Sequence, residues 1–322
     1  MRVLLTGSSG WLGRFLAPLL SRAGHAVTGL DIAPGSHTDT IGSVEDAGLV
    51  ERLFAEHRFE GVVHAGALHK PDIVRYPAQA FVDVNVAGTL HLLEAAVRHG
   101  TKAFVFTSTT SLMITQAIRD EVAPQAVWLD EQSGPLAPRN IYGVTKRAAE
   151  ELCRLTHDLH GLPVIALRVA RFFPEDDDTH AVPAGENLKA NEFLNRRLTV
   201  EDCAAAHLAT LDAAPRIGWG VYVVSAPPPF TRADAARLKE DAAGLIAERC
   251  PEAPALYAAR GWVLPQSIGR VYDPSAIERD LGFRCETDFA EVLAALREGR
   301  AMPFAHDPGY VPPKEKNRLA GS

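Results

Sequence analysis

Residues Thr6-Gly7-Ser8-Ser9-Gly10-Trp11-Leu12-Gly13 lie between the first apolar run of the chain and its first amphipathic stretch. The apolar run at residues 3–5 predicts a buried strand, and apolar residues recur at helical spacing over residues 12–20. Glycines spaced in this way permit a tight turn, a close approach of backbone to a pyrophosphate, and close packing of helix on strand. The free N–H groups at a helix N-terminus favour phosphate. The segment therefore predicts a dinucleotide site.

Asp31 directly follows the second expected strand, residues 26–30. A carboxylate at this point can accept hydrogen bonds from a ribose 2′-hydroxyl and would repel a 2′-phosphate, so NAD is favoured over NADP. Two alternatives stay open. Asp31 could be a solvated turn residue before Pro34, and the guanidinium of Arg14 could serve the phosphate of NADP.

Strand and helix signals alternate along the chain, which predicts an α/β fold with a doubly wound parallel sheet of the Rossmann type. The expected strands are residues 3–5, 26–30, 61–63, 103–107, 164–167 and 221–224. The expected helices are residues 12–20, 49–54, 80–99, 142–160, 232–249 and 288–299. Gly161 is expected to close the helix at 142–160.

The regularity of these signals weakens near residue 170, so we expect two parts. Residues 1–170 with 198–226 are predicted to form the dinucleotide-binding domain. Residues 171–197 and 227–300 are predicted to form a small substrate-binding lobe over the carboxyl edge of the sheet. The proline- and charge-rich residues 301–322 are expected to pack loosely.

The composition excludes several other classes of protein. The 322 residues carry a net charge of -7, which gives no basic footprint for nucleic acid. No apolar run approaches the roughly 20 residues of a membrane span. The first expected strand leaves no room for a signal peptide, and the four cysteines form no CxxC pair. We therefore expect a cytoplasmic protein without disulfides and without a metal site.

Tyr142-Gly143-Val144-Thr145-Lys146 place a phenol and an ammonium four residues apart in an expected helix. Residues at this spacing share one helix face, so both groups can address the same small volume. We expect the ammonium to lower the pKa of Tyr142, because a nearby cation favours the phenolate. Thr109 follows an expected strand at the sheet edge where such folds bind ligands, and its hydroxyl can orient an alcohol. The three side chains predict general-base chemistry on a secondary alcohol.

At these positions the chain resembles the NAD-dependent epimerase/dehydratase family, the extended short-chain dehydrogenases/reductases. The likeness covers about the first 225 residues and returns near the C-terminus. Its further motifs are Val62-Val63-His64-Ala65-Gly66-Ala67, Asn85-Val86-Ala87-Gly88-Thr89, the lead at residues 134–140, Arg168, Leu198-Thr199-Val200-Glu201-Asp202 and Asp280-Leu281-Gly282-Phe283.

The resemblance implies roles for individual residues. Tyr142 is the implied base, Lys146 its partner and Thr109 the hydroxyl that orients the substrate. The implied cofactor contacts are Gly7, Ser9, Gly10, Trp11, Leu12, Gly13, Asp31, Ile32, Ser43, Val44, His64, Ala65, Gly66, Ala67, Asn85, Thr107, Tyr142 and Lys146. The implied substrate contacts are Leu68, Thr109, Thr110 and Arg171. The resemblance also implies a homodimer, built through the helices at 80–99 and 142–160.

The chain departs from the family pattern at informative places. Ser43 stands where relatives carry an aspartate on the adenine, and Asp46 is the alternative for that role. Thr110 and Ser111 replace the Asp-Glu pair of the dehydratases, so sugar dehydration is disfavoured. Only 25 residues separate Pro174 from Val200, a shorter cap than nucleotide-sugar enzymes have.

Arg171 stands where nucleotide-sugar enzymes usually have an asparagine, just past a strand end. A guanidinium there suits a substrate carboxylate. The short cap and Gly13-Arg14 are similar to uronate dehydrogenases. The alternative is that Arg171 pairs with the acidic run at residues 175–178.

The predicted function is thus NAD-dependent oxidation of a secondary alcohol on a sugar, sugar acid or nucleotide sugar. The sequence leaves open whether the hydride is returned, as in an epimerase, or leaves with the cofactor, as in a dehydrogenase. A different class of protein, a catalytically silent NAD-binding scaffold or sensor, is the further alternative.

Overall fold

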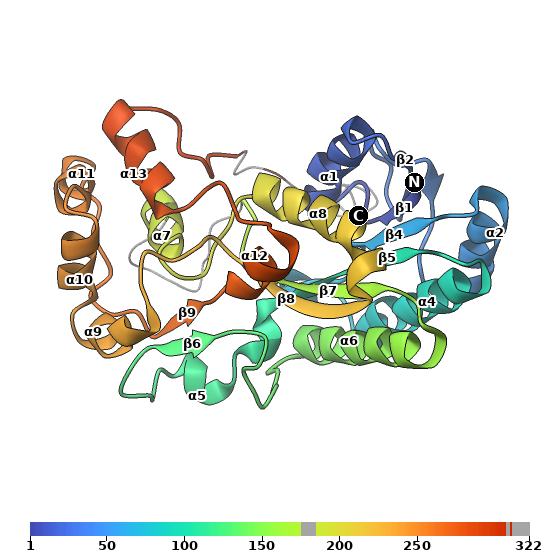
Figure 1. Ribbon diagram of the computed structural model, residues 1–322, viewed down its shortest axis with the longest axis horizontal. Coiled ribbons are helices and arrows are strands. Elements are labelled where there is room, and N and C mark those ends of the chain that lie inside the picture. Colours follow the sequence, from blue (N-terminus) through green and yellow to red (C-terminus); the bar gives the residue numbers. More distant parts are fainter. Residues whose placement is uncertain (175–184, 307–309, 311–322) are drawn as a thin grey trace.

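The computed structural model describes residues 1–174, 185–306 and 310. Its centre is a seven-stranded parallel sheet in the order β3-β2-β1-β4-β5-β7-β8, which confirms the doubly wound class (Figure 1). The strands are β1 (Arg2–Thr6), β2 (Ala26–Asp31), β3 (Thr40–Ile41), β4 (Gly61–His64), β5 (Ala103–Thr109), β7 (Val164–Val169) and β8 (Trp219–Val224). A second, two-stranded sheet pairs β6 (Val127–Leu129) with β9 (Arg270–Tyr272).

The strand order reverses at β1, which pairs with β2 on one side and with β4 on the other. In doubly wound sheets this switch point leaves a crevice beyond the carboxyl ends of the strands, and ligands bind there. Thr6, the last residue of β1, lies opposite Leu30 of β2 and His64 of β4. The glycine-rich segment therefore begins at the mouth of the crevice.

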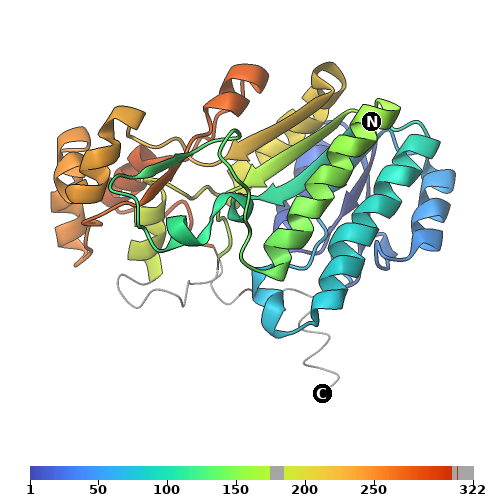
Figure 2. The same ribbon diagram turned by 90° about the horizontal axis from the view of Figure 1, so that it is seen from below.

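Helices cover both faces of the sheet (Figures 1 and 2). One face carries α1 (Trp11–Arg22) and α8 (Val200–Ile217), and the other carries α2 (Ala47–His57), α3 (Ala78–Val82), α4 (Gly88–Arg98) and α6 (Ile141–His160). Side chains of β1 alternate between the two layers, because successive residues of a strand point to opposite faces. Val3 and Leu5 are buried with α1 and α8, and Leu4 is buried with α2 and α4.

The helix expected at residues 80–99 is divided by a π-helical turn, η2 (Asp83–Ala87), between α3 and α4. Turns of this kind are frequent at functional sites. The turn directs Asn85 inward, where its amide accepts from the Leu68 N–H at 2.9 Å and donates to the Leu68 carbonyl at 3.0 Å. By length and composition the run Ala78–Arg98 could span a membrane, but Leu92 and Leu93 of α4 pack under the sheet as core residues.

The lobe lies beside the carboxyl edge of the sheet (Figure 1). Its elements are α7 (Gly185–Glu192), η4 (Arg232–Asp234), α9 (Ala235–Glu240), α10 (Ala242–Arg249), α11 (Ala253–Ala259) and α13 (Phe289–Glu298). The helix expected at residues 232–249 is broken at Asp241, whose carboxylate caps α10 by accepting from the Gly244 N–H at 3.0 Å. Met302 and Phe304 are buried in the lobe core, which departs from the loose packing expected after residue 300.

Four short elements connect these layers: η1 (Lys70–Val74), η3 (Thr110–Met113), α5 (Gln116–Arg119) and α12 (Ser275–Leu281). Residues 111–129 are held by structural contacts. Met113 is buried in the core on the face of the sheet that carries α1 and α8. The indole N–H of Trp128 donates to Asp273 at 2.9 Å, beside the β6–β9 pair.

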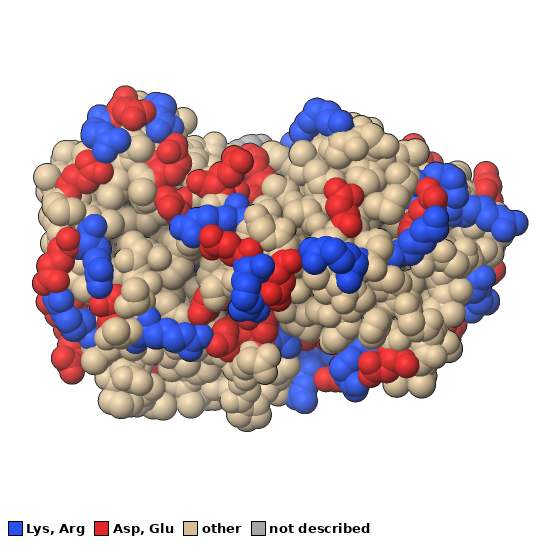
Figure 3. Space-filling model, in the orientation of Figure 1, with Lys and Arg blue, Asp and Glu red and all other residues tan. Residues whose placement is uncertain are grey.

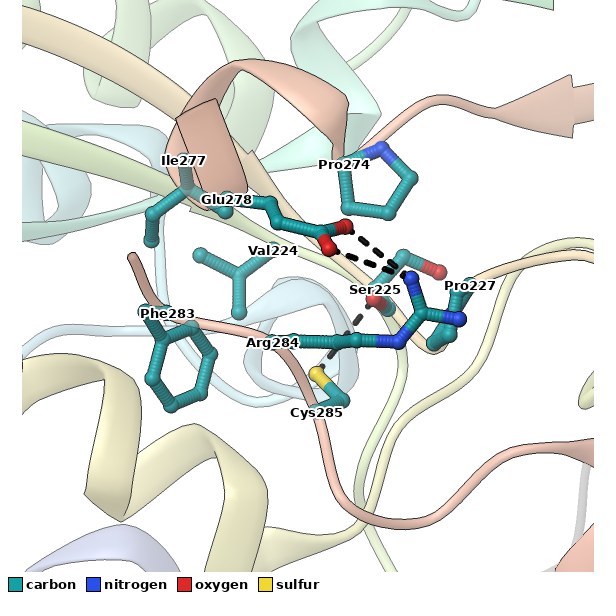
Figure 4. A pocket seen from close by; sticks show the side chains of 9 residues that line it. All are labelled: Val224, Ser225, Pro227, Pro274, Ile277, Glu278, Phe283, Arg284 and Cys285. Carbon is teal, nitrogen blue, oxygen red and sulfur yellow. Dashed lines mark hydrogen bonds and ion pairs between the residues drawn. The ribbon is translucent and has the colours of Figure 1, made fainter. Parts of the chain in front are cut away.

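The last strand of the large sheet is joined to the segment after α12 at a small pocket (Figure 4). The Cys285 thiol donates to the Ser225 carbonyl at 3.3 Å, and Arg284 pairs with Glu278 at 3.0 Å. The pocket has a volume of about 10 Å³, room for little more than one water, so it is no substrate site. On the face in Figure 3 acidic and basic side chains are intermixed.

Candidate active site

The glycine-rich loop is shaped by contacts that exclude side chains. Gly7 has a φ of +75°, and a Cβ there would lie 2.7 Å from the Gly66 nitrogen. A Cβ on Gly13 would lie 2.2 Å from the Gly7 carbonyl oxygen. No side chain caps the N-terminus of α1 at Gly10, so its first N–H groups can serve a phosphate. This loop fits a pyrophosphate.

Asp31 ends β2 beside this loop. Its carboxylate accepts from the Ser9 N–H at 3.0 Å and from the Ala33 N–H at 3.2 Å. A carboxylate offers about four acceptor positions, so two such bonds leave capacity for ribose hydroxyls. Asp31 also lines the cavity described next. Its position favours the ribose role over that of a solvated turn residue.

A cavity of about 440 Å³ follows the carboxyl edge of the sheet from Asp31 to Thr107. Its lining includes fourteen of the residues expected from the sequence: Gly7, Ser9, Gly10, Trp11, Leu12, Asp31, Ile32, Ser43, Val44, Ala65, Gly66, Ala67, Leu68 and Thr107. An elongated cavity with a carboxylate at one end and a phosphate-binding loop beside it fits a dinucleotide. Asp46 instead caps α2, accepting from the Leu49 N–H at 2.9 Å, so Ser43 is the better candidate for the adenine.

His64 holds the floor of the crevice and does not line the cavity. Its Nδ1 lies 2.7 Å from the Thr6 hydroxyl, and its Nε2 lies 3.0 Å from the Thr89 hydroxyl. The Thr89 hydroxyl donates to the Asn85 carbonyl, so its oxygen accepts from Nε2–H. In the neutral ring Nδ1 then accepts from the Thr6 hydroxyl. Burial lowers the pKa of His64 to about 3. We interpret the histidine as a structural support that fixes Thr6, which accepts from the Gly66 N–H at 3.0 Å.

None of the three expected catalytic side chains is among the residues that line the cavity, but Tyr142 lies beside His69 and Lys146 beside Thr107, which both line it. Asn140 caps α6 by accepting from the Gly143 N–H at 2.9 Å, which sets the first turn of the helix. The Thr109 hydroxyl lies close enough to the phenol of Tyr142, in that turn, to lower its pKa. The pKa of Tyr142 is raised to about 12, mainly by burial; Thr109 acts against this rise and Asp72 adds to it.

Lys146 lies one turn along α6 but points to the sheet. Its ammonium donates to the Thr107 carbonyl at 2.7 Å and lies 4.6 Å from the centre of the Phe106 ring. Burial lowers the pKa of Lys146 to about 7, against an opposite effect of Glu150. The expected lowering of the Tyr142 pKa by this ammonium is therefore wrong for the protein by itself, because burial dominates both groups.

Thr107 joins this group to α8. Its hydroxyl lies 2.8 Å from His207 Nε2, and His207 Nδ1 lies 2.7 Å from the Cys203 carbonyl. Since a carbonyl can only accept, Nδ1 carries the proton and Nε2 accepts from Thr107. Burial lowers the pKa of His207 to about 4. Both polar atoms of Thr107 are thus fixed, the hydroxyl by His207 and the carbonyl by Lys146.

The wall of the cavity nearest Tyr142 contains residues that the sequence did not single out for binding. The ring of His69 lies 5.9 Å from that of Tyr142 and 5.7 Å from that of Phe173. Asp72 is buried and accepts from the His69 N–H at 2.7 Å. The other lining residues without a predicted contact are Leu30, Gly42, Pro71, Arg75, Val84, Phe172 and Tyr310.

Arg171 lies past the end of β7, beside a carboxylate that three guanidiniums share. Glu192 is 2.8 Å from Arg197, 3.2 Å from Arg196 and 4.0 Å from Arg171. Glu192 and Arg197 are buried, whereas Arg171 is about a quarter exposed (28%). The acidic run at residues 175–178 lies outside the described residues.

The comparisons with known proteins point to one family. Residues 3–223 match the model of the NAD dependent epimerase/dehydratase family. The UDP-glucose 4-epimerase of Azospirillum brasilense is 30% identical over 199 residues, which cover 58% of this chain and 54% of the relative. The uronate dehydrogenase of Pseudomonas syringae pv. tomato is 28% identical over 180 residues, covering 54% of this chain and 60% of the relative. The chain thus spans little more than half the length of these curated relatives.

A solved structure agrees in fold. The UDP-glucose 4-epimerase of Thermus thermophilus, solved as a complex with NAD, has a TM-score of 0.62 and 22% sequence identity to this chain. The match covers 92% of this chain and 99% of that one.

Proposed function

Because the chain belongs to the NAD-dependent epimerase/dehydratase family, whose model covers residues 3–223, we propose that it oxidises a secondary alcohol of a sugar-like substrate. The family's cofactor is NAD, and the crevice offers the loop, the carboxylate and the cavity that NAD requires. The observation that carries the proposal is that the Thr109 hydroxyl lies close enough to the Tyr142 phenol to lower its pKa, beside this cavity. A phenol and an alcohol-orienting hydroxyl are thus in one place.

The chain's own residues provide the acid–base part of the reaction. Thr109 holds the substrate hydroxyl against Tyr142, whose phenolate oxygen removes the proton. Bound NAD supplies the nicotinamide carbon that accepts a hydride and a positive charge near the phenol. Lys146 fixes the edge of β5 through the Thr107 carbonyl, and Thr107 lines the cavity.

For the substrate we propose an acidic sugar, which makes a dehydrogenase of the uronate type the preferred reaction. The support is Arg171, a guanidinium just past the end of β7 at the carboxyl edge of the sheet, whose side chain is about a quarter exposed (28%). A planar guanidinium forms paired hydrogen bonds with a carboxylate. Phe172 and Phe173, which line the cavity, directly follow Arg171 and connect it to the site.

Two further proposals concern the state of the protein. We propose a homodimer through α6, because Val144, Leu155 and Leu159 are apolar and exposed along this helix. We propose a cytoplasmic location, since the four cysteines of the chain are free thiols. Light scattering after gel filtration tests the dimer, with Leu159→Asp as the variant expected to weaken it.

One assay separates the proposed activities. The purified protein is incubated with NAD and a panel of uronates, neutral sugars and UDP-sugars, and NADH is followed by its absorbance together with the sugar products. A dehydrogenase accumulates NADH with its substrate, whereas an epimerase converts a sugar without net NADH. Tyr142→Phe should bind NADH like the parent but lose roughly 100-fold or more of the activity. Binding without turnover on any substrate would overturn the proposal in favour of a scaffold.

A further inference from the structure

The cavity that fits the dinucleotide is lined by one residue from the far end of the chain. Tyr310 lies on the same lining as Gly10, Trp11 and Leu12, the start of α1. Nearly 300 residues separate it from this loop in the sequence. Because the N–H groups at the start of α1 are where a pyrophosphate binds, Tyr310 adjoins the phosphate-binding part of the cavity.

One aromatic and one cationic contact hold Tyr310 there, and Arg14 also contacts Trp11. Its ring centre is 4.8 Å from that of Trp11, and the Arg14 guanidinium lies 5.0 Å from the Tyr310 ring and 5.6 Å from the Trp11 ring. Trp11 is itself fixed, because it is buried and its indole N–H donates to the Phe172 carbonyl at 3.2 Å. Tyr310 therefore packs on a rigid platform that belongs to the loop.

His306 anchors the same segment four residues earlier. Its ring lies 5.4 Å from that of Trp11 and 5.7 Å from that of Phe15, and it lies 3.3 Å from Glu201 of α8. His306 and Tyr310 thus both contact Trp11 at the start of α1. These contacts, together with the burial of Met302 and Phe304, differ from the loose packing expected for this part of the chain.

We propose that Tyr310 is a dinucleotide-binding residue, which covers the pyrophosphate in the same subunit and slows its release. Its hydroxyl donates to a phosphate oxygen, and its ring excludes water from the start of α1. Arg14 holds the ring from outside and adds positive charge near the phosphates. In this role Arg14 supports binding of the pyrophosphate of NAD rather than a 2′-phosphate of NADP. The proposal rests on the NAD site of the proposed function.

The test is the binding and release of NADH by Tyr310→Ala, Tyr310→Phe and the parent. Hydrogen bonds to charged groups are strong enough that losing one weakens binding about tenfold or more. We expect Tyr310→Ala to release NADH about tenfold faster in stopped-flow fluorescence, with a nearly unchanged association rate. Tyr310→Phe keeps the ring without the donor and should lie between. Val122→Ala, at an exposed position after α5, is the control.

Competition with fragments shows which part of the cofactor is contacted. ADP carries the pyrophosphate and should bind about tenfold more weakly to Tyr310→Ala, whereas adenosine should bind as it does to the parent. Unchanged NADH release from a folded Tyr310→Ala, or equal weakening of ADP and adenosine, would overturn the inference. A parent protein that does not bind NADH would instead overturn the proposed function itself.

Discussion

The ammonium of Lys146 donates a 2.7 Å hydrogen bond to the main-chain carbonyl of Thr107, the residue of β5 that lines the cavity. The helix that carries Tyr142 is thereby tied to the sheet edge where the substrate is expected. The same burial that enforces this bond lowers the pKa of Lys146 to about 7. The charge of Lys146 consequently changes within the working range of most enzymes.

We expect this titration to appear in the pH dependence of alcohol oxidation. A base with a pKa of about 12, as for Tyr142, gives a rate that rises with pH because more phenolate is present. Lys146 is protonated below its pKa of about 7 and loses its charge above it. Without this cation the phenolate form of Tyr142 is less favoured, which opposes the rise in rate. The rate should therefore increase up to about pH 7 and then level off.

Lys146→Arg is the variant that tests this explanation, because a guanidinium keeps its charge at every pH used. Its rate of oxidation should be lower overall but should continue to rise through neutral pH and above. Initial rates of NADH formation from mildly acidic to alkaline pH provide the measurement. If the variant levels off at the same pH as the parent, a group other than Lys146 is responsible.

Cofactor choice should depend on the charge of Asp31. Asp31→Asn keeps an oxygen that can accept from the Ser9 and Ala33 N–H groups but removes the repulsion of a 2′-phosphate. We expect the ratio of Kd values for NADP and NAD to fall by about tenfold or more, a change of about 1.4 kcal/mol. Fluorescence titration with NADH and NADPH measures both constants. An unchanged ratio would show that Asp31 serves only the loop.

Acid should destabilise the protein through its buried neutral histidines. His64 and His207 have pKa values lowered from 6.5 to about 3 and about 4, so the unfolded chain binds more protons than the folded one below pH 6.5. Stability is thus fully present above pH 6.5 and is lost as the pH falls toward 4. At about pH 5 each histidine should lower the free energy of unfolding by about 2 kcal/mol.

Urea unfolding of His207→Asn measures how much of this loss of stability comes from one histidine. The amide can still donate to the Cys203 carbonyl but does not titrate, so the loss of stability between about pH 7 and about pH 5 should be about 2 kcal/mol smaller than in the parent. His160→Asn, at an exposed histidine, should leave that loss unchanged. Equal losses in His207→Asn and the parent would contradict the assigned pKa.

Local sequence patterns were sufficient for six of the seven strands of the large sheet and for the dinucleotide loop, whereas β3 (Thr40–Ile41) was not expected. The strand at residues 3–5 and the glycines after it fix a turn through short-range sterics, and β1 and α1 appear where that pattern places them. The sequence pattern correctly placed Tyr142 and Lys146 on one helix, α6, because the α-helix has the same periodicity wherever it occurs. These features depend on neighbours in the chain.

Features that depend on tertiary contacts were not predictable in the same way. Burial decides the pKa of Tyr142, and no spacing of residues reports how much water reaches a side chain. Tyr310 contacts Trp11, nearly 300 residues away in the chain, and the proline- and charge-rich sequence around Tyr310 does not predict this contact. The Asn-x-x-Gly-Thr motif identified Asn85 as a candidate residue. It does not predict the π-helical turn that directs its side chain inward.

The charge at the end of β7 leads to the last prediction, which concerns the substrate. If the Arg171 guanidinium receives a carboxylate, Arg171→Ala should raise the KM for a uronate by roughly ten- to a hundredfold, since charge-assisted hydrogen bonds of this kind contribute about 1.5 to 3 kcal/mol. The KM for the matching neutral hexose should stay the same, because that sugar offers no charge to Arg171. Arg171→Lys, which keeps the charge without the paired donors, should fall between parent and Arg171→Ala. Glu192 keeps Arg196 and Arg197 as partners in both variants, so the thermal unfolding midpoint should change little and serves as the control for folding. Equal increases in KM for the acidic and the neutral sugar would assign Arg171 to the packing of the lobe and leave the substrate without a carboxylate site.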